Sequence, residues 1–368
     1  MTEPVRVAQV VGKMVGGGVE AVVMNYYRHI DRGKVQFDFL VDSDSTLVPR
    51  DEIESLGGRV FEIPPYQHVA EYQRELQRLF KQESWKIVHS HINALSVFPL
   101  RAAKKAGVPV RIAHSHSTSG KGEYAKNALK SVLKTQSNRY PTHRFACSKF
   151  AGEWLFGKDA HFEVVYNAID LDRFRFDAEA RAEARADLGL VGNQFAIGHV
   201  GRFTAQKNHA FLIDVFTEVA KCRDDAVLLL VGSGEAGASV KALVDERGLT
   251  DCVKFLGQRS DVNRLYQAFD AFVLPSLYEG LCLVGVEAQV SGLPCLLSDA
   301  ITREVDVTGE CKFLPIDNPV VWADEIDSLL PYSYEGRLSI SSGQFADYNI
   351  DLQGERLTRK YLDLYSRN

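Results

Sequence analysis

The chain has 368 residues, too many for one ordinary core and enough for two domains, and its 45% hydrophobic and 25% charged residues are typical of a soluble globular protein. The net charge of −5 gives no global reason to expect a nucleic-acid partner. No segment approaches the roughly 20 uninterrupted apolar residues of a membrane span, and the N-terminus lacks an apolar core followed by a cleavage site, so we expect a cytoplasmic protein.

Short apolar runs in the first half of the chain predict strands, several with apolar residues on both faces, as in strands buried between helix layers. They begin at Val5, Gln36, Arg59, Lys86, Val110, Arg144 and Phe162. Segments with helical periodicity, such as 71–82 and 95–107, lie between them. The alternation predicts an open parallel sheet with helices on both faces.

The pattern breaks over residues 170–194, a charged segment that indicates an interdomain connection with a helix. It restarts with strand-like runs that begin at Phe195, Ala226, Val253, Ala271 and Pro294. We therefore predict two doubly wound α/β domains, at 1–175 and 190–345, and a last helix over about 350–368. Ligands bind beyond the carboxyl ends of such strands, so two domains that face each other would form one cleft.

The stretch that follows the first strand contains Gly16, Gly17 and Gly18 before a predicted helix. Glycine lets backbone N–H groups approach a ligand, and a helix N-terminus favours an anion, so this is a candidate phosphate-binding loop. The alternative is a tight strand-to-helix turn. In the second domain, Arg202 and Lys207 follow the first strand, where two cations suit a diphosphate. Taken singly, each is also typical of a solvated loop.

Glu279 and Glu287 are eight residues apart, with Glu287 in a predicted helix whose first turn follows Glu279. Eight residues is just over two helical turns, so the pair can face one ligand from two depths. A favourable charge at a helix start is the alternative for Glu279. Glu287 lies in an apolar stretch, where a carboxylate needs a partner or ligand hydroxyls.

Four histidines end two predicted strands, His89 with His91 and His114 with His116. Each pair faces one side of its strand, but carboxylates and cysteines with ligand spacing are missing. Hydrogen bonding to a ligand is favoured over metal, and a structural role is favoured further for His89 and His114.

Three patterns are weaker guides. Gly232 to Gly237 spells G-x-G-x-x-G, but it lies in the second strand–helix unit of its domain, so a dehydrogenase is disfavoured. The acidic triplet 42–44 follows a strand and could hold a divalent metal against a nucleotide diphosphate, whereas the triplet 170–172 lies in the connection. With Arg202 and Lys207 available to neutralise the diphosphate, a metal is not needed. The six cysteines, most of them in apolar runs, are expected to be free thiols and not disulfides or zinc ligands. They are Cys147, Cys222, Cys252, Cys282, Cys295 and Cys311.

Basic residues gather over 121–149 against a single acid, Glu123. They are Lys121, Lys126, Lys130, Lys134, Arg139, Arg144 and Lys149. A helix with such a stripe could rest on anionic lipid, or it could be an ordinary solvated helix face.

Together these motifs resemble the retaining glycosyltransferases of family 4, which have the GT-B fold, and especially those of bacterial exopolysaccharide and capsule synthesis. The resemblance covers nearly the whole chain. It rests on Gly-Gly-x-Glu at 17–20, HSH at 89–91, HSHST at 114–118, NAID at 167–170, HVGRFTAQKN at 199–208, and PSLYEG, VEAQ and GLP from Pro275. The spacing of Glu279 and Glu287 is the family's signature. Cys282-Leu283 departs from many relatives, which leaves the donor sugar open.

The resemblance implies that Gly16 and Gly17 cradle the donor diphosphate, and that Arg202 and Lys207 neutralise it. Arg259 would lie near the base. The last helix would cross back onto the first domain.

The resemblance also assigns the residues around the sugar. Glu287 would accept bonds from the ribose hydroxyls. Glu279 would face the transferred sugar, and His116 would hold it from the opposite domain. Main-chain groups from Gly280 to Val284 would assist, which include those of Gly280, Leu281, Leu283 and Val284.

The implied reaction moves a sugar from a nucleoside diphosphate sugar, with UDP favoured over GDP, to a glycan or lipid-linked glycan, with retention and without a metal or other cofactor. Same-face attack is implied, in which the leaving phosphate takes the acceptor proton. A sugar-nucleotide epimerase or hydrolase, and a non-catalytic sugar-nucleotide-binding subunit, are the competing interpretations.

Overall fold

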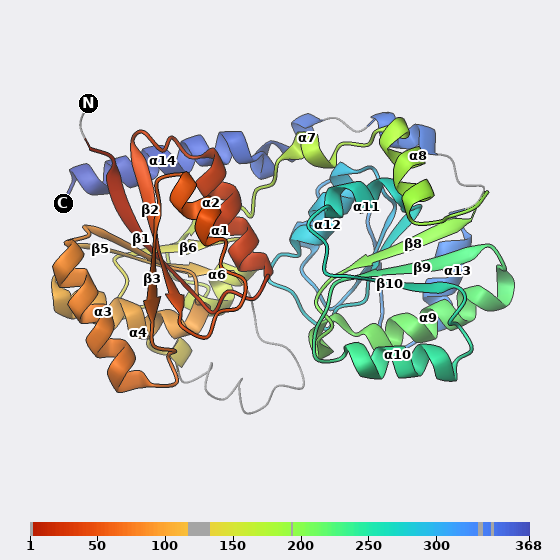
Figure 1. Cartoon of the computed structure of the whole chain (residues 1–368), viewed down its shortest axis with the longest axis horizontal. Coiled ribbons are helices and arrows are strands. Elements are labelled where there is room, and N and C mark those ends of the chain that lie inside the picture. The colour runs from red at the N-terminus through yellow and green to blue at the C-terminus, as the bar shows by residue number, and fades with distance from the viewer. Residues whose placement is uncertain (1–2, 117–132, 193, 330–333, 340–341) are drawn as a thin grey trace. The chain divides into compact units, whose positions relative to one another are not determined.

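The computed structural model describes residues 3–116, 133–192, 194–329, 334–339 and 342–368 (Figure 1). These residues form two compact units. The first comprises Met1–Asp170 and Asp347–Asn368, and the second comprises Leu171–Ala346. Each unit is a parallel sheet with helices, which confirms the predicted fold class of two doubly wound α/β domains.

The first unit is built on a seven-stranded sheet with the order β3-β2-β1-β4-β5-β6-β7, in which each neighbouring pair is parallel. Its strands are β1 (Val5–Gly12), β2 (Val35–Asp42), β3 (Arg59–Ile63), β4 (Ile87–Ser90), β5 (Val110–Ser115), β6 (His143–Ala146) and β7 (Glu163–Val164). Its helices include α1 (Gly18–His29), α2 (Arg50–Ser55), α3 (Val69–Glu83), α4 (Val97–Ala106), α6 (Lys149–Phe156) and α14 (Ile350–Ser366).

Helix α3 shows why these segments take their places. Tyr72, Leu76, Leu79 and Phe80 recur at helical spacing on one face, and all four are buried with Trp85 in the core of the first unit. Each fully buried apolar side chain of this size contributes roughly 1.5–3 kcal/mol. Arg74 and Arg78, on the opposite face, are exposed.

The last helix, α14, packs on the first unit although it follows the second in sequence. Its N-terminus is capped by Asn349, whose side chain accepts from the N–H groups of Asp351 and Leu352. Gly354 allows a close crossing over α1, because a Cβ there would lie 2.8 Å from the His29 carbonyl oxygen. This crossing places Tyr361 in the core of the unit, where it is fully buried.

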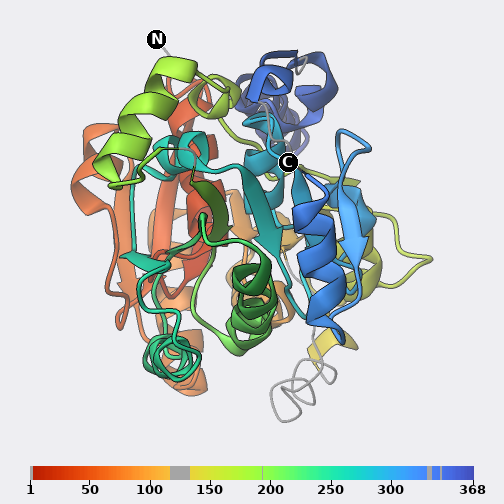
Figure 2. The ribbon, with the colours of Figure 1, turned by 90° about the vertical axis from the view of Figure 1, so that its right-hand side faces the viewer.

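The second unit has a six-stranded parallel sheet with the order β10-β9-β8-β11-β12-β13. Its strands are β8 (Phe195–Val200), β9 (Ala226–Val231), β10 (Val253–Gly257), β11 (Ala271–Leu274), β12 (Cys295–Ser298) and β13 (Lys312–Leu314). Its helices include α7 (Leu171–Phe174), α8 (Ala178–Asp187), α9 (His209–Cys222), α10 (Gly237–Glu246), α11 (Val262–Ala268), α12 (Leu283–Val290) and α13 (Pro319–Asp327). Helices α9 and α13 pack together beside the sheet, as seen in green and blue in Figure 2.

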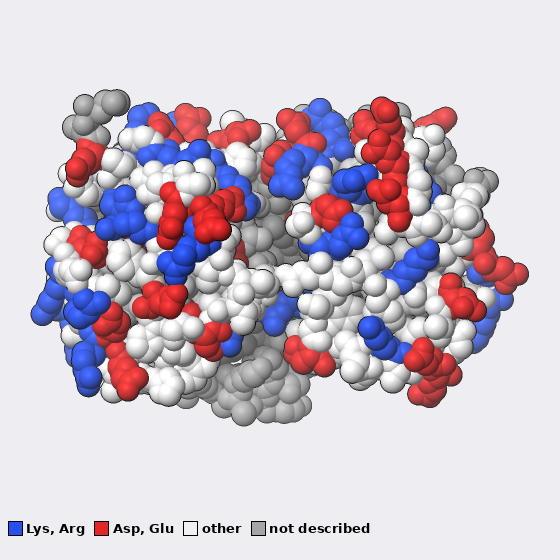
Figure 3. Space-filling view, in the orientation of Figure 1, with Lys and Arg blue, Asp and Glu red and all other residues white. Residues whose placement is uncertain are grey.

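The segment 170–194, which the sequence suggests is a connection, is almost wholly part of the second unit. Helix α8 turns two arginines inward, where Arg181 and Arg185 both bond to the buried carboxylate of Asp270. Its outer face carries Glu179, Glu183 and Asp187, and acidic side chains gather there in Figure 3. The charged residues of this segment suggested an interdomain connection, but two of them, Arg181 and Arg185, anchor α8 to its own unit.

In both sheets the order of the strands reverses at the first strand of the unit. Strand β1 lies between β2 and β4, and β8 lies between β9 and β11. Loops that leave the carboxyl ends of such neighbouring strands diverge and leave a crevice for ligands. The loops after β1, β4, β8 and β11 carry most of the residues that the sequence singles out.

Candidate functional site

The glycine-rich loop after β1 is held by the protein's own carboxylate. Oε2 of Glu20 accepts from the N–H groups of Val15, Gly16 and Gly17 at 3.0, 2.6 and 3.0 Å. Gly16 has a φ of 81°, a left-handed conformation that favours glycine. The loop thus gathers backbone donors, and in this structure they bond to the carboxylate of Glu20. A diphosphate at this loop has to share or displace Glu20.

The four histidines at the ends of β4 and β5 are brought together and buried, each 6% exposed or less. Nε2 of His89 lies 3.0 Å from Nδ1 of His114, and Nδ1 of His91 lies 2.9 Å from Nε2 of His116. Burial lowers the pKa of His116 to about 4 and lowers the pKa of each of the other three well below the usual range. All four rings are therefore neutral at pH 7.

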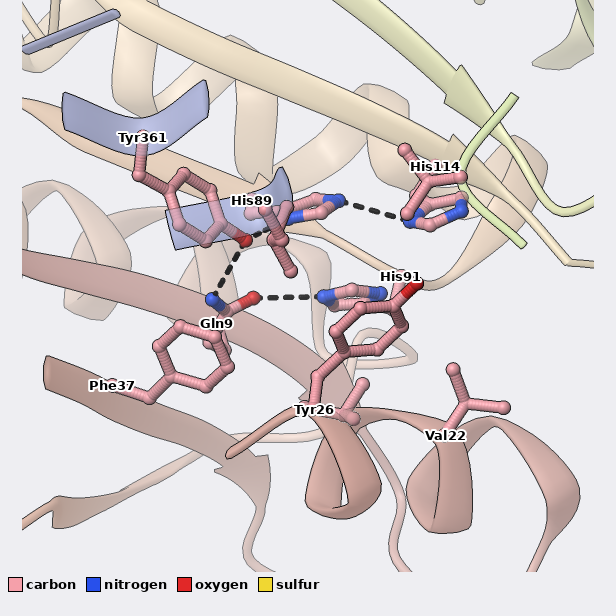
Figure 4. A pocket seen from close by; sticks show the side chains of 11 residues that line it. Gln9, Val22, Tyr26, Phe37, His89, His91, His114 and Tyr361 are labelled. Carbon is pink, nitrogen blue, oxygen red and sulfur yellow. Dashed lines mark hydrogen bonds between the residues drawn. The ribbon is translucent and has the colours of Figure 1, made fainter. Parts of the chain in front are cut away.

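Two further side chains, Gln9 and Tyr361, join the four histidines in one histidine network. Figure 4 shows Gln9, Tyr361, His89, His91 and His114. Nε2 of Gln9 donates to the Tyr361 hydroxyl at 3.1 Å, and Oε1 of Gln9 lies 2.8 Å from Nε2 of His91. The same hydroxyl lies 2.6 Å from Nδ1 of His89. Apolar side chains, among them Val22 and Phe37, line the adjoining pocket.

Within the described part of the chain, His89, His91 and His114 are the residues placed to hold a metal ion, with ligand atoms within 4.8 Å of one another. Ring nitrogens of all three already hydrogen-bond inside the network. The residues that line the pocket include no carboxylate to offset a buried dication. The arrangement suits neutral hydrogen-bonded rings better than a zinc ion.

In the second unit, Lys207 and Glu279 meet although they follow different strands. Nζ of Lys207 lies 2.7 Å from Oε1 of Glu279, and Nε2 of Gln206 donates to Oε2 at 3.1 Å. The two charged side chains are only 15% and 11% exposed. Gly201 makes room for the lysine, because a Cβ there would lie 3.1 Å from its Cε. Both carboxylate oxygens of Glu279 are thus engaged.

Glu287 lies in α12, and Glu279 precedes this helix, which begins at Leu283 and not directly after Glu279 as predicted. Oε2 of Glu287 accepts from the Tyr266 hydroxyl at 2.9 Å. Withdrawal from water raises the pKa of Glu287 to about 7, although the bond from Tyr266 and the charge of Arg173 act in the other direction. The partner that the sequence requires for this carboxylate is Tyr266.

The remaining predicted residues are placed as follows. Arg202 is exposed in the loop after β8, and Arg259, in the loop after β10, forms a two-bond pair with Asp261 at 2.7 and 2.6 Å. Gly280 and Leu281 are buried in the loop that leads to α12, and Leu283 and Val284 form its first turn.

The G-x-G-x-x-G sequence at 232–237 has a packing explanation. A Cβ on Gly232 would lie 2.1 Å from the Gly201 carbonyl oxygen, and one on Gly234 would lie 2.5 Å from that of Phe203. These glycines let the loop after β9 lie against the loop after β8. Of the first acidic triplet, Asp42 ends β2 and Asp44 lies in the turn that follows, where Lys13 pairs with it at 2.6 Å.

Comparison with known proteins decides the family. Residues 194–331 match the model for glycosyl transferases group 1, and residues 16–173 match that for glycosyltransferase family 4. A Bacillus subtilis protein named putative glycosyltransferase EpsF is 38% identical over 332 residues, which span 87% of this chain and 86% of that protein. The chain belongs to glycosyltransferase family 4.

Other relatives extend this result. An Escherichia coli protein named UDP-Gal:alpha-D-GlcNAc-diphosphoundecaprenol alpha-1,3-galactosyltransferase is 30% identical over 269 residues, which span 69% of this chain and 67% of that protein. The structure of Anabaena Alr3699/HepE in complex with UDP-glucose superposes with a TM-score of 0.80 at 18% identity, over 97% of this chain and 99% of that one. The likeness in structure confirms the GT-B fold.

Sequence reasoning about this glycosyltransferase named Glu20 only as part of a motif and gave it no role, and it missed the roles of Gln9, Tyr361 and Tyr266. Glu20 carried a signal, because an acid three residues after a helix cap is the mark of a capping box. The residues that partner the histidines and Glu287 gave no sequence signal that spacing could reveal.

The basic segment 121–149 lies partly outside the described residues, which omit 117–132. Of its described part, Lys134 lies over the Trp154 ring and Lys149 pairs with Glu153.

None of the helices in the described ranges is long and apolar enough to cross a membrane. None of the six cysteines, all of which lie in the described ranges, forms a disulfide. Cys147, Cys282 and Cys295 are buried as expected, whereas Cys222 is exposed.

Proposed function

We propose that this glycosyltransferase moves a sugar from a UDP-sugar to a glycan or lipid-linked glycan, with retention and without a metal, in the synthesis of an exopolysaccharide or capsule. The name of the E. coli relative, which specifies a UDP-sugar and a lipid-linked acceptor, supports the substrate classes. A second relative, the B. subtilis protein, is named putative glycosyltransferase EpsF, and this name supports the transfer of a sugar.

The observation that carries the mechanism is the Lys207–Glu279 pair. A carboxylate whose two oxygens bond to Lys207 and Gln206 is a poor nucleophile and a fixed acceptor for sugar hydroxyls. An ammonium has three N–H donors, so Lys207 can also donate to a leaving diphosphate, beside Arg202.

The proposed step balances without a covalent intermediate. The bond between the sugar C1 and the diphosphate oxygen breaks, and the acceptor oxygen bonds to C1 on the same face. The acceptor proton passes to the leaving phosphate oxygen. Glu287 accepts from the ribose hydroxyls, and His116 accepts from the sugar.

Donor binding is expected to raise the thermal unfolding midpoint, because UDP binds the folded state only. The shift should survive a chelator and fall in Lys207→Ala and Glu287→Ala. GDP, ADP and NAD serve as matched ligands in the same scan. A shift with NAD alone, or one that requires added metal, would contradict the proposal.

We place the enzyme in the cytoplasm, with the basic segment 121–149 against anionic lipid that carries the acceptor. The purified enzyme is expected to co-sediment with anionic vesicles at low salt and to be released at high salt. Neutral vesicles are the control, and equal recovery with both kinds would oppose this placement.

A further inference from the structure

Two of the six cysteines lie side by side at the edge of the second sheet. Strands β12 and β13 are parallel neighbours in a register that pairs Leu296 with Lys312. Cys295 is the first residue of β12 and Cys311 directly precedes β13, so the two cysteines occupy the preceding position of the same register. Adjacent strands lie about 4.8 Å apart, and residues at matching positions point to the same face of the sheet.

The two thiols also influence each other. Hydrogen bonding with the Cys295 thiol is the largest of the causes that raise the pKa of Cys311, ahead of burial and of the Asp306 carboxylate. Such an influence requires that the two sulfur atoms face each other. A disulfide needs Cα atoms about 4.4–6.8 Å apart and Cβ atoms that point toward each other. The strand register meets the first requirement, and the facing thiols meet the second.

The two cysteines differ in their access to solvent. Cys311 is half-buried, whereas Cys295 is 3% exposed and its thiol donates to the Leu293 carbonyl at 3.3 Å. A small oxidant can therefore reach Cys311 and not Cys295. This difference suits oxidation in two steps, in which the accessible sulfur reacts first and the buried sulfur then displaces the oxidant's remaining half.

A bond between these cysteines would hold a weakly attached part of the second unit. Within the described residues, β13 is three residues long and has a strand neighbour on one side only. Short edge elements open before the core does. The loop before β13 is attached to α12 by Gln289, whose Nε2 donates to the Val305 carbonyl at 2.8 Å and whose Oε1 accepts from the Val307 N–H at 2.9 Å. A disulfide would close this loop and fix the edge strand to β12.

We propose that Cys295 and Cys311 are a modification site, at which a small disulfide such as oxidised glutathione produces a reversible intramolecular disulfide that stabilises the second unit. The Cys311 thiolate attacks one sulfur of the oxidant and releases the first small thiol. The Cys295 thiolate then attacks the Cys311 sulfur and releases the second. Two S–H bonds are lost and one S–S bond forms, and the two electrons and two protons remain with the two small thiols. The inference does not rest on the proposed function.

Mass spectrometry and thermal unfolding of the full chain test this proposal. Exposed Cys222 would take up glutathione by itself, so every sample carries Cys222→Ser. The reduced chain is incubated with oxidised glutathione at pH 8, alkylated and digested without reductant. We expect a cross-linked peptide pair that contains Cys295 and Cys311, and an intact mass lower by two hydrogen atoms. The unfolding midpoint should rise by about 5–10 °C, because the closed loop restricts the unfolded chain. Dithiothreitol should reverse all three changes.

Cys252→Ser is the matched control. Cys252 is also half-buried and directly precedes β10, the strand at the other edge of the same sheet. The register of β10 on β9 pairs Val253 with Leu228 and so places Val227, which has no thiol, beside Cys252. Cys252→Ser should keep the cross-link and the rise in midpoint, and Cys311→Ser should lose both. Hydrogen exchange of the β13 amides should slow on oxidation in the chains that keep Cys311.

Two results would overturn the proposal. One is a folded, oxidised chain in which Cys311 carries glutathione and Cys295 stays a free thiol. The other is a cross-link that leaves the midpoint unchanged or lowers it. If Cys311→Ser does not fold, the comparison of the oxidised chain before and after dithiothreitol still decides between these outcomes and the expected one.

Discussion

Replacing Lys207 by methionine is expected to lower kcat at least 100-fold, the largest single loss in this glycosyltransferase. Methionine keeps most of the apolar stem and removes the ammonium that bonds to Glu279 at 2.7 Å. A fixed cation that meets charge developing on a leaving group typically contributes a factor of 10²–10³. Steady-state turnover of the UDP-sugar by the wild type and by the purified variant measures this loss in kcat.

The same change should also destabilise the fold, because Glu279 keeps its charge and loses its main partner in a place that is mostly closed to water. We expect the free energy of unfolding to fall by about 2 kcal/mol in urea denaturation. The double variant Lys207→Met/Glu279→Gln removes both charges and should regain most of that stability without regaining turnover.

Two controls separate chemistry from packing. Lys221 and Glu218 form a comparable pair at 2.6 Å on α9, where the lysine is 61% exposed, so Lys221→Met should change stability by less than about 0.5 kcal/mol and leave kcat alone. Glu279→Gln alone should slow turnover and form no sugar adduct in the intact mass. If stability and turnover recovered together in the double variant, the lysine would be a structural residue only.

The fold could be predicted from the sequence because most of the strands coincide with a short apolar run. Seven strands, β1, β3, β5, β8, β9, β10 and β11, begin at the residues where the runs begin. Strand β13 was missed because it is a three-residue edge strand, Lys312–Leu314, too short to show alternation. Helix α8 was mistaken for part of a linker because its inward arginines look solvated until Asp270, over 80 residues away, is placed beside them.

The site could be predicted only where single residues follow strand ends. Arg202, Lys207, Glu279, His91 and His116 lie in such loops, and His89 and His114 lie near the carboxyl ends of β4 and β5. Parallel strands point their carboxyl ends to one edge of the sheet. The side chains that orient them are not at strand ends. Gln9 meets Tyr361 across 352 positions of the chain, and no periodicity links a residue inside β1 to one in the last helix.

Glu287→Gln is expected to raise KM for the donor about 10- to 100-fold, because an amide offers one acceptor oxygen where a carboxylate offers two charge-assisted ones. The pKa of Glu287, raised to about 7, adds a pH dependence. The carboxylate that would hold the ribose is half-formed near pH 7, so KM for the donor should fall in the wild type as pH rises from 6 to 8. The variant should lack this trend.

As pH rises, donor binding should improve, whereas the stability of the fold should decline. A carboxyl with a raised pKa holds its proton in the folded chain after the unfolded chain has lost it, so stability declines as pH rises from the unfolded value of 4.5 to about 7. Since Glu287 keeps part of its surface in water, we expect roughly 1–2 kcal/mol over this window. Urea unfolding at pH 5 and pH 8 should show the decline in the wild type and not in Glu287→Gln.

Glu310→Gln, at an exposed position, is the matched control and should leave both trends as they are in the wild type.

The neutral form of Glu287 is well accommodated, because its proton can go to the Tyr266 oxygen while the Tyr266 hydroxyl donates to the Val284 carbonyl at 3.1 Å. The ionised form gains the bond from Tyr266 and the attraction of Arg173 and Lys207, which together offset only part of its desolvation. A donor that supplies two ribose hydroxyls would replace what the carboxylate lacks, so saturating UDP should flatten the stability profile between pH 5 and pH 8. A profile that stays steep with UDP bound would place the ribose elsewhere.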